Sequence, residues 1–100
     1  KSIVADRPAA LEAALRLAIS RADLVVTTGG LGPTDDDLTR DAIASATGAA
    51  LREVPAIIEA IARRFASRGM VMPGINRRQA LVPEGAEPLD NPHGTAPGLY

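Results

Sequence analysis

A segment rich in glycine and aspartate near residue 30 carries the residue types best suited to binding a ligand. It reads Thr-Thr-Gly-Gly-Leu-Gly-Pro-Thr-Asp-Asp-Asp over residues 27–37. Glycines let the backbone approach a phosphate closely, and the free N–H groups at a helix start donate to its oxygens. A strand, this loop and a helix in that order predict a phosphate-binding loop. The alternative interpretation is a tight turn before a well-capped helix, which needs no ligand.

Three consecutive aspartates, Asp35 to Asp37, bear on the phosphate interpretation because carboxylates repel a phosphate. No lysine lies in the loop, and Arg40 is the nearest basic residue in sequence. A hard divalent cation can be shared between carboxylate and phosphate oxygens, so we expect a metal bound by Asp36 or Asp37. The aspartates could instead only complement the positive end of a helix dipole.

The flanking sequence predicts the elements that position this loop. Residues 24–28 form a short apolar run, typical of a buried strand in a parallel sheet covered on both faces. Apolar residues at helical spacing predict three helices, and Pro and Gly mark their ends. We expect Asp6 to cap the first helix and Thr34 the second. The expected helices run from about Pro8 to residue 22, from 35 to 47 and from 55 to 68, with short strands at 80–82 and 87–89.

The composition excludes several classes of function. The chain has 100 residues, which fits one domain, and a net charge of −1, which gives no electrostatic footprint for nucleic acid or anionic membranes. Phe65 and Tyr100 are its only aromatic residues, too few for a base-stacking platform. The absence of cysteine excludes disulfides, thiol nucleophiles and Cys-ligated zinc. No apolar run approaches the roughly 20 residues of a membrane span, and we expect a cytoplasmic location.

Two motifs together resemble the competence/damage-inducible protein A (CinA) family. The first is Thr27 to Thr34 followed by Asp36-Asp37-Leu38-Thr39. The second, in the tail, comprises Asn76, Gln79-Ala80 and the run from Asn91 to Gly98. The resemblance covers nearly the whole chain.

This resemblance implies a fold and an activity. The family's N-terminal domain is similar to molybdopterin-binding proteins, which have a three-layer α/β/α sandwich with a mostly parallel sheet. It is associated with ADP-ribose pyrophosphatase activity that needs a divalent metal such as magnesium, manganese or cobalt, and with homo-oligomers. The family domain opens with a strand and closes with a strand and a Pro-Gly-rich loop that do not occur here. We therefore expect residues 1–100 to be one partial domain, truncated at both ends.

The resemblance also implies roles for single residues. Asp37 matches a functional acid of the wider fold and Asp6 matches a second one, so both become candidate catalytic residues, with Asp36 and Asp37 as metal ligands. The glycine loop is similar to the part that lines the ligand pocket, and Asn91 and its neighbours resemble the loop that faces it across a cleft. The expected ligand-binding residues are Thr28, Gly29, Gly30, Gly32, Thr34, Thr39, Asn76, Gln79, Asn91, Gly94 and Thr95.

Several alternatives stay open. The same loop could bind the pterin of molybdenum-cofactor biosynthesis, or belong to a binding domain without catalysis. Arg77 and Arg78 could contact a phosphate or form a solvated basic turn. His93, the only histidine, is expected to be an exposed loop residue. The apolar stripe Ile57/Ile61/Phe65 is expected to be core or a subunit interface.

Overall fold

Three α-helices, one 3₁₀-helix and two short pairs of strands make up the chain. The structure is a computed structural model that describes residues 1–100. In chain order the elements are α1 (Pro8–Arg21), α2 (Thr39–Thr47), β1 (Leu51–Glu53), α3 (Pro55–Ala66), η1 (Gly74–Ala80), β2 (Leu81–Pro83), β3 (Pro88–Leu89) and β4 (Gly98–Leu99). The chain therefore mixes helices and strands, with most of the strands in its last fifth.

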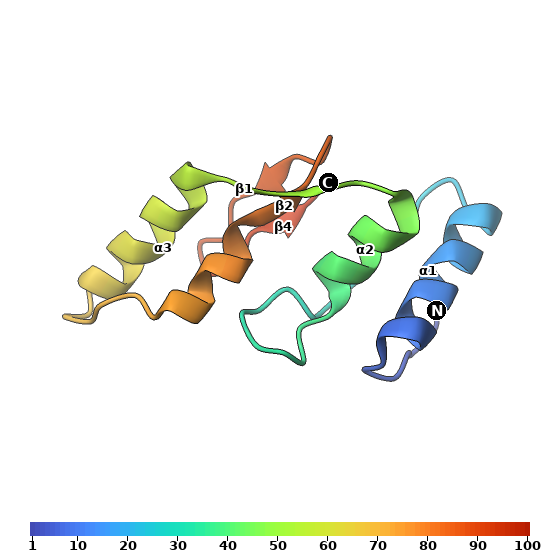
Figure 1. Cartoon of the computed structure of the whole chain (residues 1–100), viewed down its shortest axis with the longest axis horizontal. Coiled ribbons are helices and arrows are strands. Elements are labelled where there is room, and N and C mark those ends of the chain that lie inside the picture. The colour runs from blue at the N-terminus through green and yellow to red at the C-terminus, as the bar shows by residue number, and fades with distance from the viewer.

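The elements lie in a row along the longest of the principal extents, which are 45 × 25 × 21 Å. Figure 1 shows α1 packed beside α2 at one end and α3 beside η1 at the other, while β1 runs between the two halves. Glu12 of α1 links the first pair, because it accepts hydrogen bonds from Arg16 and from Ser45 of α2. These two bonds hold the pKa of Glu12 below its usual range.

The helix starts confirm part of the sequence prediction and correct the rest. Pro8 and Pro55 occupy the first turns of α1 and α3, where a missing N–H costs nothing. Asp6 makes no capping hydrogen bond, because Arg7 is the N-cap residue of α1. The second helix begins at Thr39 and not at residue 35, so Thr34 does not cap it. Residues 34–37 instead form a turn of their own, closed by the Asp37 N–H donating to the Thr34 carbonyl.

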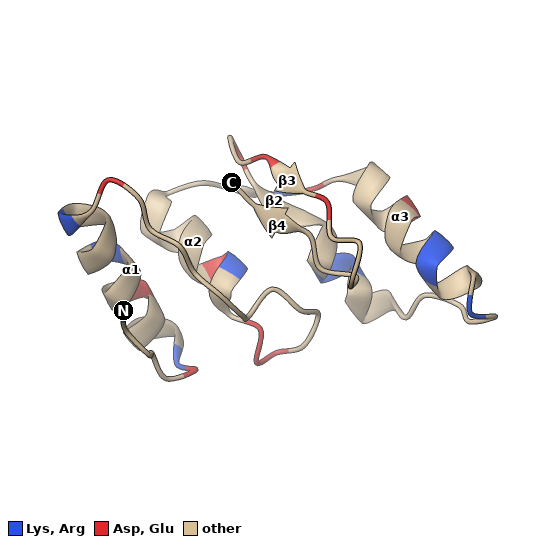
Figure 2. Cartoon of the chain, turned by 180° about the vertical axis from the view of Figure 1, so that it is seen from behind, with Lys and Arg blue, Asp and Glu red and all other residues tan.

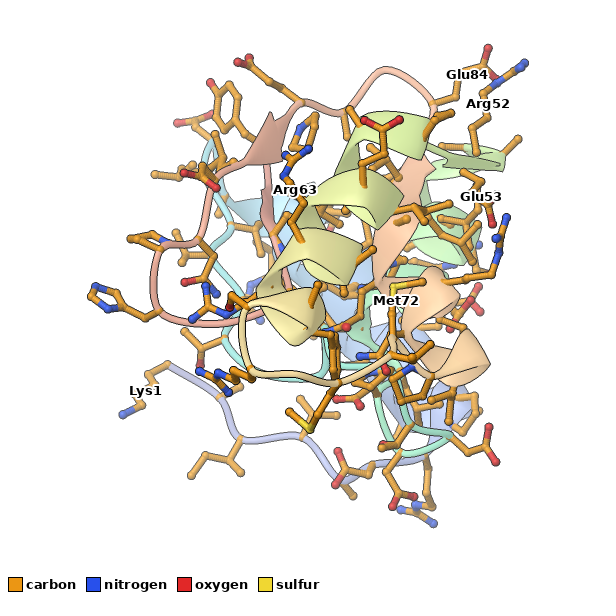
Figure 3. The ribbon with its side chains drawn as sticks, turned by 90° about the vertical axis from the view of Figure 1, so that its left-hand side faces the viewer. Lys1, Arg52, Glu53, Arg63, Met72 and Glu84 are labelled. Atoms are coloured by element: carbon orange, nitrogen blue, oxygen red, sulfur yellow. The ribbon has the colours of Figure 1, made fainter.

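The strands form two short antiparallel pairs, which do not confirm the expected mostly parallel sheet. β1 pairs with β2, with Arg52 opposite Val82, and β3 pairs with β4. Arg52 also forms an ion pair of 3.2 Å with Glu84 just beyond β2, and Figure 3 shows the two side chains meeting at the end of this ribbon. The first pair brings residues 81–83 against residues 51–53, and β2 also contacts α2.

Residues 24–28 correct the clearest strand prediction. They form no regular element and pair with no strand, and Leu24 and Val26 are 72% and 76% exposed. The apolar run led to the prediction of a buried central strand, but a strand also needs neighbours that accept and donate its backbone hydrogen bonds. No other segment among residues 1–100 lies in position to do so.

The buried interior is small and lies between the helices and β2. Its apolar members are Leu15, Ala42, Ala44, Ile61, Ala80 and Val82. Four polar or charged residues are buried beside them, namely Thr39, Arg40, Asn76 and Gln79. Charges of both signs are spread along the ribbon in Figure 2, and acidic positions precede α2. None of the helices combines the length and the apolar content that a membrane crossing requires.

Candidate functional site

The glycine loop is fastened to the start of α2 by Thr39. The Thr39 N–H donates to the Gly30 carbonyl at 3.1 Å, and its hydroxyl donates to the Gly29 carbonyl at 2.8 Å. Gly30 has a positive φ of +73°, and a Cβ built on it would overlap the Thr39 hydroxyl. Glycine at position 30 is therefore required by the loop's contact with its own helix, a reason that the phosphate interpretation did not include.

Three consecutive N–H groups of this loop remain free. The backbone nitrogens of Gly29, Gly30 and Leu31 donate to no hydrogen bond, and neither do those of Arg40 and Asp41 at the start of α2. Gly29 has room in front of it, since a Cβ there would meet nothing within 4 Å. Free donors beside the positive end of a helix are the features that bind anions in other proteins.

Asp37 faces into the loop and not into a cleft. Its Oδ2 accepts hydrogen bonds from the Thr34 hydroxyl at 2.8 Å and from the Thr34 N–H at 2.9 Å. The Thr34 hydroxyl, the Thr34 N–H and the Gly32 N–H, in that order of importance, hold the pKa of Asp37 below its usual range. Asp37 is therefore ionised at neutral pH and is the acceptor that closes this turn.

The other two aspartates are more accessible. Asp35 is fully exposed, with one oxygen 3.4 Å from Arg78 Nη1, and Asp36 makes no hydrogen bond or ion pair. No three His, Asp or Glu side chains come close enough together to hold a metal ion by themselves. Magnesium needs only one or two carboxylates when ligand phosphates supply further oxygens. The free carboxylate of Asp36 fits that shared arrangement, whereas a metal held by the protein alone does not fit.

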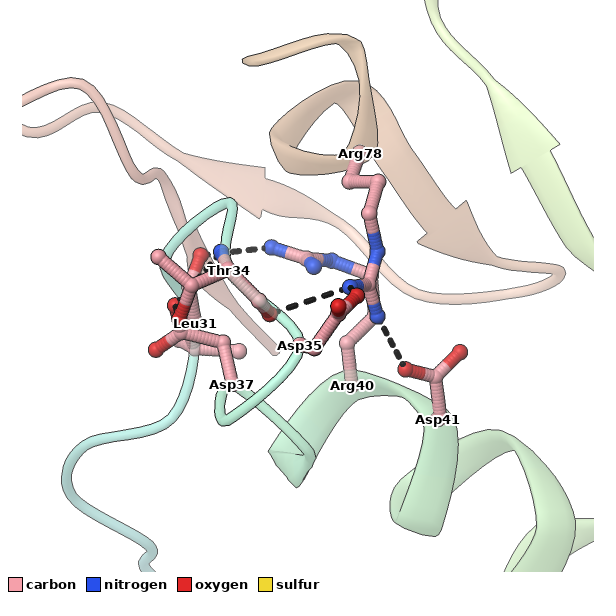
Figure 4. Close-up of polar contacts among 7 residues, drawn as sticks. All are labelled: Leu31, Thr34, Asp35, Asp37, Arg40, Asp41 and Arg78. Atoms are coloured by element: carbon pink, nitrogen blue, oxygen red, sulfur yellow. Dashed lines mark hydrogen bonds and ion pairs between the residues drawn. The ribbon is translucent and has the colours of Figure 1, made fainter. Parts of the chain in front are cut away.

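Two arginines reach the loop from different elements. Arg40 Nη2 donates to the Leu31 carbonyl at 2.7 Å, and its side chain is buried. Arg78 of η1 donates from Nη1 to the Thr34 carbonyl at 3.0 Å and pairs through Nη2 with Asp41 at 3.0 Å. Figure 4 shows both guanidinium groups between the loop and α2. A loop without basic residues in sequence thus acquires two in space.

Sequence reasoning left Arg77 and Arg78 equivalent, and the structure separates them. In a 3₁₀-helix successive side chains point about 120° apart, so neighbours face different partners. Arg77 pairs with Glu53 of β1, while Arg78 turns to the loop. The two adjacent arginines were the sequence signal for a basic group near the loop. Only the placement of η1 against α2 and the loop selects Arg78 as that group.

The predicted tail residues form a separate network. Asn76 donates to Gln79 at 2.8 Å, and Gln79 donates to the Thr95 hydroxyl at 2.9 Å. Asn91 donates to the Ala96 carbonyl and accepts from the His93 N–H, and a Cβ on Gly94 would lie 3.1 Å from the Asn91 amide nitrogen. These side chains fix the loop of residues 91–97. None of them bonds to residues 28–39.

The tail loop borders a cleft of about 460 Å³ against α3. Asn91, Gly94 and Thr95 line it together with Arg64, but no residue of the glycine loop does. The two groups of predicted ligand-binding residues therefore do not share one pocket among the described residues. His93 is exposed, as expected.

The remaining predicted residues are Thr28 and Asp6. Thr28 precedes the glycine loop and makes no side-chain hydrogen bond. Asp6 is exposed in the bend before α1 and has no partner. Figures 1 and 2 show α1 at one end of the row and the loop before α2 nearer its middle, both reaching the lower edge of the view. No hydrogen bond or ion pair joins Asp6 to Asp36 or to Asp37, the other candidate acid.

Comparison with known proteins adds a family to this geometry. The model of a family described as "Probable molybdopterin binding domain" matches residues 1–100. A CinA-like protein of Nostoc sp. is 52% identical over 99 residues, which are 99% of this chain and 23% of that protein. A CinA-like protein of Deinococcus deserti is 52% identical over 100 residues, or 100% and 25% of the two chains. The chain thus spans about a quarter of the length of these relatives.

A solved structure is similar as well. The crystal structure of the protein CinA from Thermoplasma acidophilum, whose function is described as unknown, superposes with a TM-score of 0.80 at 35% sequence identity. The match covers 94% of this chain and 54% of that one. The similarity therefore extends over nearly the whole chain.

Proposed function

The chain belongs to the family of probable molybdopterin-binding domains and is similar along its whole length to CinA-like proteins, and on this premise we propose that its glycine loop binds the phosphates of a nucleotide. The proposed ligand is of ADP-ribose type, and the proposed reaction is its metal-dependent hydrolysis. The free N–H groups of Gly29, Gly30 and Leu31 beside the start of α2 carry this proposal. They form a row of donors with no partner in the chain, which suits the oxygens of a diphosphate.

Electrostatics support the metal. Arg78 is already paired with Asp35 and Asp41, so the carboxylates of Asp36 and Asp37 remain to repel an anion. One such unit-charge pair at about 6 Å and an effective dielectric constant of 20 repels by roughly 3 kcal/mol. The helix start returns typically about 1 kcal/mol. The guanidinium of Arg40, which no carboxylate pairs, offsets one of the two aspartates. A diphosphate still needs further positive charge at this loop, and Asp36 is the carboxylate free to share a divalent cation with it.

The proposed reaction adds water across the diphosphate bond of ADP-ribose and yields AMP and ribose 5-phosphate. A bound divalent cation would supply positive charge to the phosphoryl oxygens. The loop N–H groups hold the diphosphate, and Asp6 is the candidate to accept the proton of the attacking water. The lowered pKa of Asp37 makes it a weak proton acceptor at neutral pH, so its role is to hold Thr34 and with it the loop.

Molybdopterin is the second candidate ligand, and the family description favours it. Its phosphate would use the same N–H groups, but no bond of the ligand would be cleaved. A third candidate is a domain that binds a phosphorylated ligand without acting on it. The loop geometry is common to all three proposals, so the ligand's fate must distinguish them.

The deciding experiment incubates the protein with ADP-ribose and magnesium, manganese or cobalt, and follows AMP and ribose 5-phosphate by chromatography. Hydrolysis that stops on chelation, and that falls in Asp36→Asn but not in Asp23→Asn, supports the first proposal. Asp23 is a suitable control because it is exposed and lies outside the loop. Retention of molybdopterin without ADP-ribose turnover would replace the first proposal by the second, and binding of either without turnover would favour the third.

A further inference from the structure

Arg40 is buried without partners for most of its donors. Only 1% of the residue is exposed, and one nitrogen, Nη2, donates to the Leu31 carbonyl. Its Nε and Nη1 are buried and have no hydrogen-bond partner. Buried charged groups are normally paired and hydrogen-bonded, because desolvation without compensation is unfavourable. The guanidinium therefore has two donors available beside the glycine loop.

A second guanidinium lies close to the first. Burial is the main influence on the pKa of Arg40 and lowers it. The charge of Asp41 raises this pKa and the charge of Arg78 lowers it, and the net effect is a lowered pKa. Both groups bond to carbonyls of the same loop, Arg40 to Leu31 and Arg78 to Thr34. Figure 4 shows the two guanidinium groups near one another beside that loop. Two like charges in such proximity are stabilised when an anion lies between them.

We propose that Arg40 and Arg78 form an anion subsite that takes a phosphoryl group bound at the glycine loop. This deepens the proposed function and rests on it for the identity of the ligand, but not for the presence of the subsite. The ligand chemistry is a tetrahedral phosphate, supplied by free phosphate, by a diphosphate or by a phosphate monoester.

The two arginines have different tasks in this subsite. Arg40 is fixed by Leu31 and presents its unused Nε and Nη1. Arg78 lies beside it and is bonded to the Thr34 carbonyl and to Asp41 at 3.0 Å each, while its contact with the fully exposed Asp35 is the longest, 3.4 Å. The contact with Asp35 is therefore the one that Arg78 can exchange for a ligand. When phosphate enters, Arg78 leaves Asp35 for the phosphoryl oxygens, and the repulsion between the two guanidinium groups is relieved.

The test follows the arginine Nε–H signals by NMR while inorganic phosphate is added in the presence of a chelator. Arg40 and Arg78 should shift saturably, and Arg78→Gln should weaken phosphate binding about tenfold, the scale of a lost charge-assisted hydrogen bond. Arg77→Gln is the matched control, since Arg77 is the adjacent arginine and pairs with Glu53. It should leave the affinity unchanged.

Further variants and ligands keep the result decisive. Arg40→Lys retains the charge but lacks the Nε–H and the planar fork, so it should also weaken phosphate binding. If Arg40→Lys does not fold, Arg78→Gln alone decides. Unmoved Arg40 signals, or equal affinities in Arg77→Gln and Arg78→Gln, would overturn the subsite. Pyrophosphate and ADP-ribose in parallel titrations show which source of phosphate binds best.

The outcomes also separate the subsite from the proposed hydrolysis. Phosphate binding that depends on Arg78, in a protein that does not turn over ADP-ribose, supports the subsite and rejects the hydrolase. If the protein turns over ADP-ribose and Arg78→Gln leaves the phosphate affinity unchanged, the hydrolase is supported and the subsite is rejected.

Discussion

Replacing Asp37 with asparagine tests how the glycine loop is held. The Asp37 carboxylate accepts two hydrogen bonds from Thr34, at 2.8 and 2.9 Å. An amide keeps one acceptor oxygen but loses the charge that strengthens both bonds. Loss of a side-chain acceptor from a turn or cap costs typically about 1 kcal/mol. Because Asp37 is half-exposed, solvent screening keeps the expected loss of unfolding free energy near that value.

The pH dependence has a definite sign. The pKa of Asp37 is lowered in the folded chain relative to its ordinary value of 3.8, so below that value the unfolded state binds more protons. The stability that Asp37 contributes is therefore complete above the unfolded pKa and is lost as pH falls through the folded pKa. The stability difference between the natural chain and Asp37→Asn should be constant from about pH 5 upward and shrink below about pH 4.

Urea unfolding followed by circular dichroism at pH 3 to 7 measures this difference, and hydrogen exchange of the Thr34 amide locates it. Asp36→Asn is the matched control, since Asp36 is the adjacent residue and makes no hydrogen bond. Equal stabilities of the two variants at every pH would refute the inference that Asp37 closes the loop. Thr34 amide exchange as slow in Asp37→Asn as in the natural chain would also refute it.

Three other outcomes are expected. Gly30→Ala should lower the free energy of unfolding in urea by about 3 kcal/mol, because it combines a positive φ with overlap of a neighbouring side chain. Gly29→Ala has the positive φ alone and should cost only about 1–2 kcal/mol, so the opposite order would contradict the loop geometry. Calorimetry should show ADP-ribose binding at least about tenfold tighter with magnesium than with chelator; equal affinity would refute the metal. Sedimentation should show self-association that decreases in the double variant Leu24→Ser/Val26→Ser, since both side chains are exposed and apolar. A stable monomer of the natural chain at high concentration would count against this self-association.

The sequence by itself determined the local features. Pro8 and Pro55 predicted the starts of two helices, and helical spacing predicted the buried Ile61, because these signals depend only on neighbours within a few turns. The glycine loop before α2 was predicted in place, and the CinA resemblance was confirmed by relatives 52% identical over almost the whole chain. The mostly parallel sandwich that the resemblance implied stays a prediction, as do the metal and the catalytic roles of the aspartates.

The tertiary structure alone decided which side chains meet at the loop. Arg78 lies 44 residues from Thr34 in sequence, and nothing in the local pattern separates it from Arg77. Asp37 was expected to face a ligand but faces Thr34, because helix α2 starts four residues later than its acidic first turn suggested. The hydrogen-bond partners that a strand at residues 24–28 would need are equally non-local. Helix propensity and capping act between near neighbours, whereas pairing of strands and distant charges depends on the packing of the whole chain.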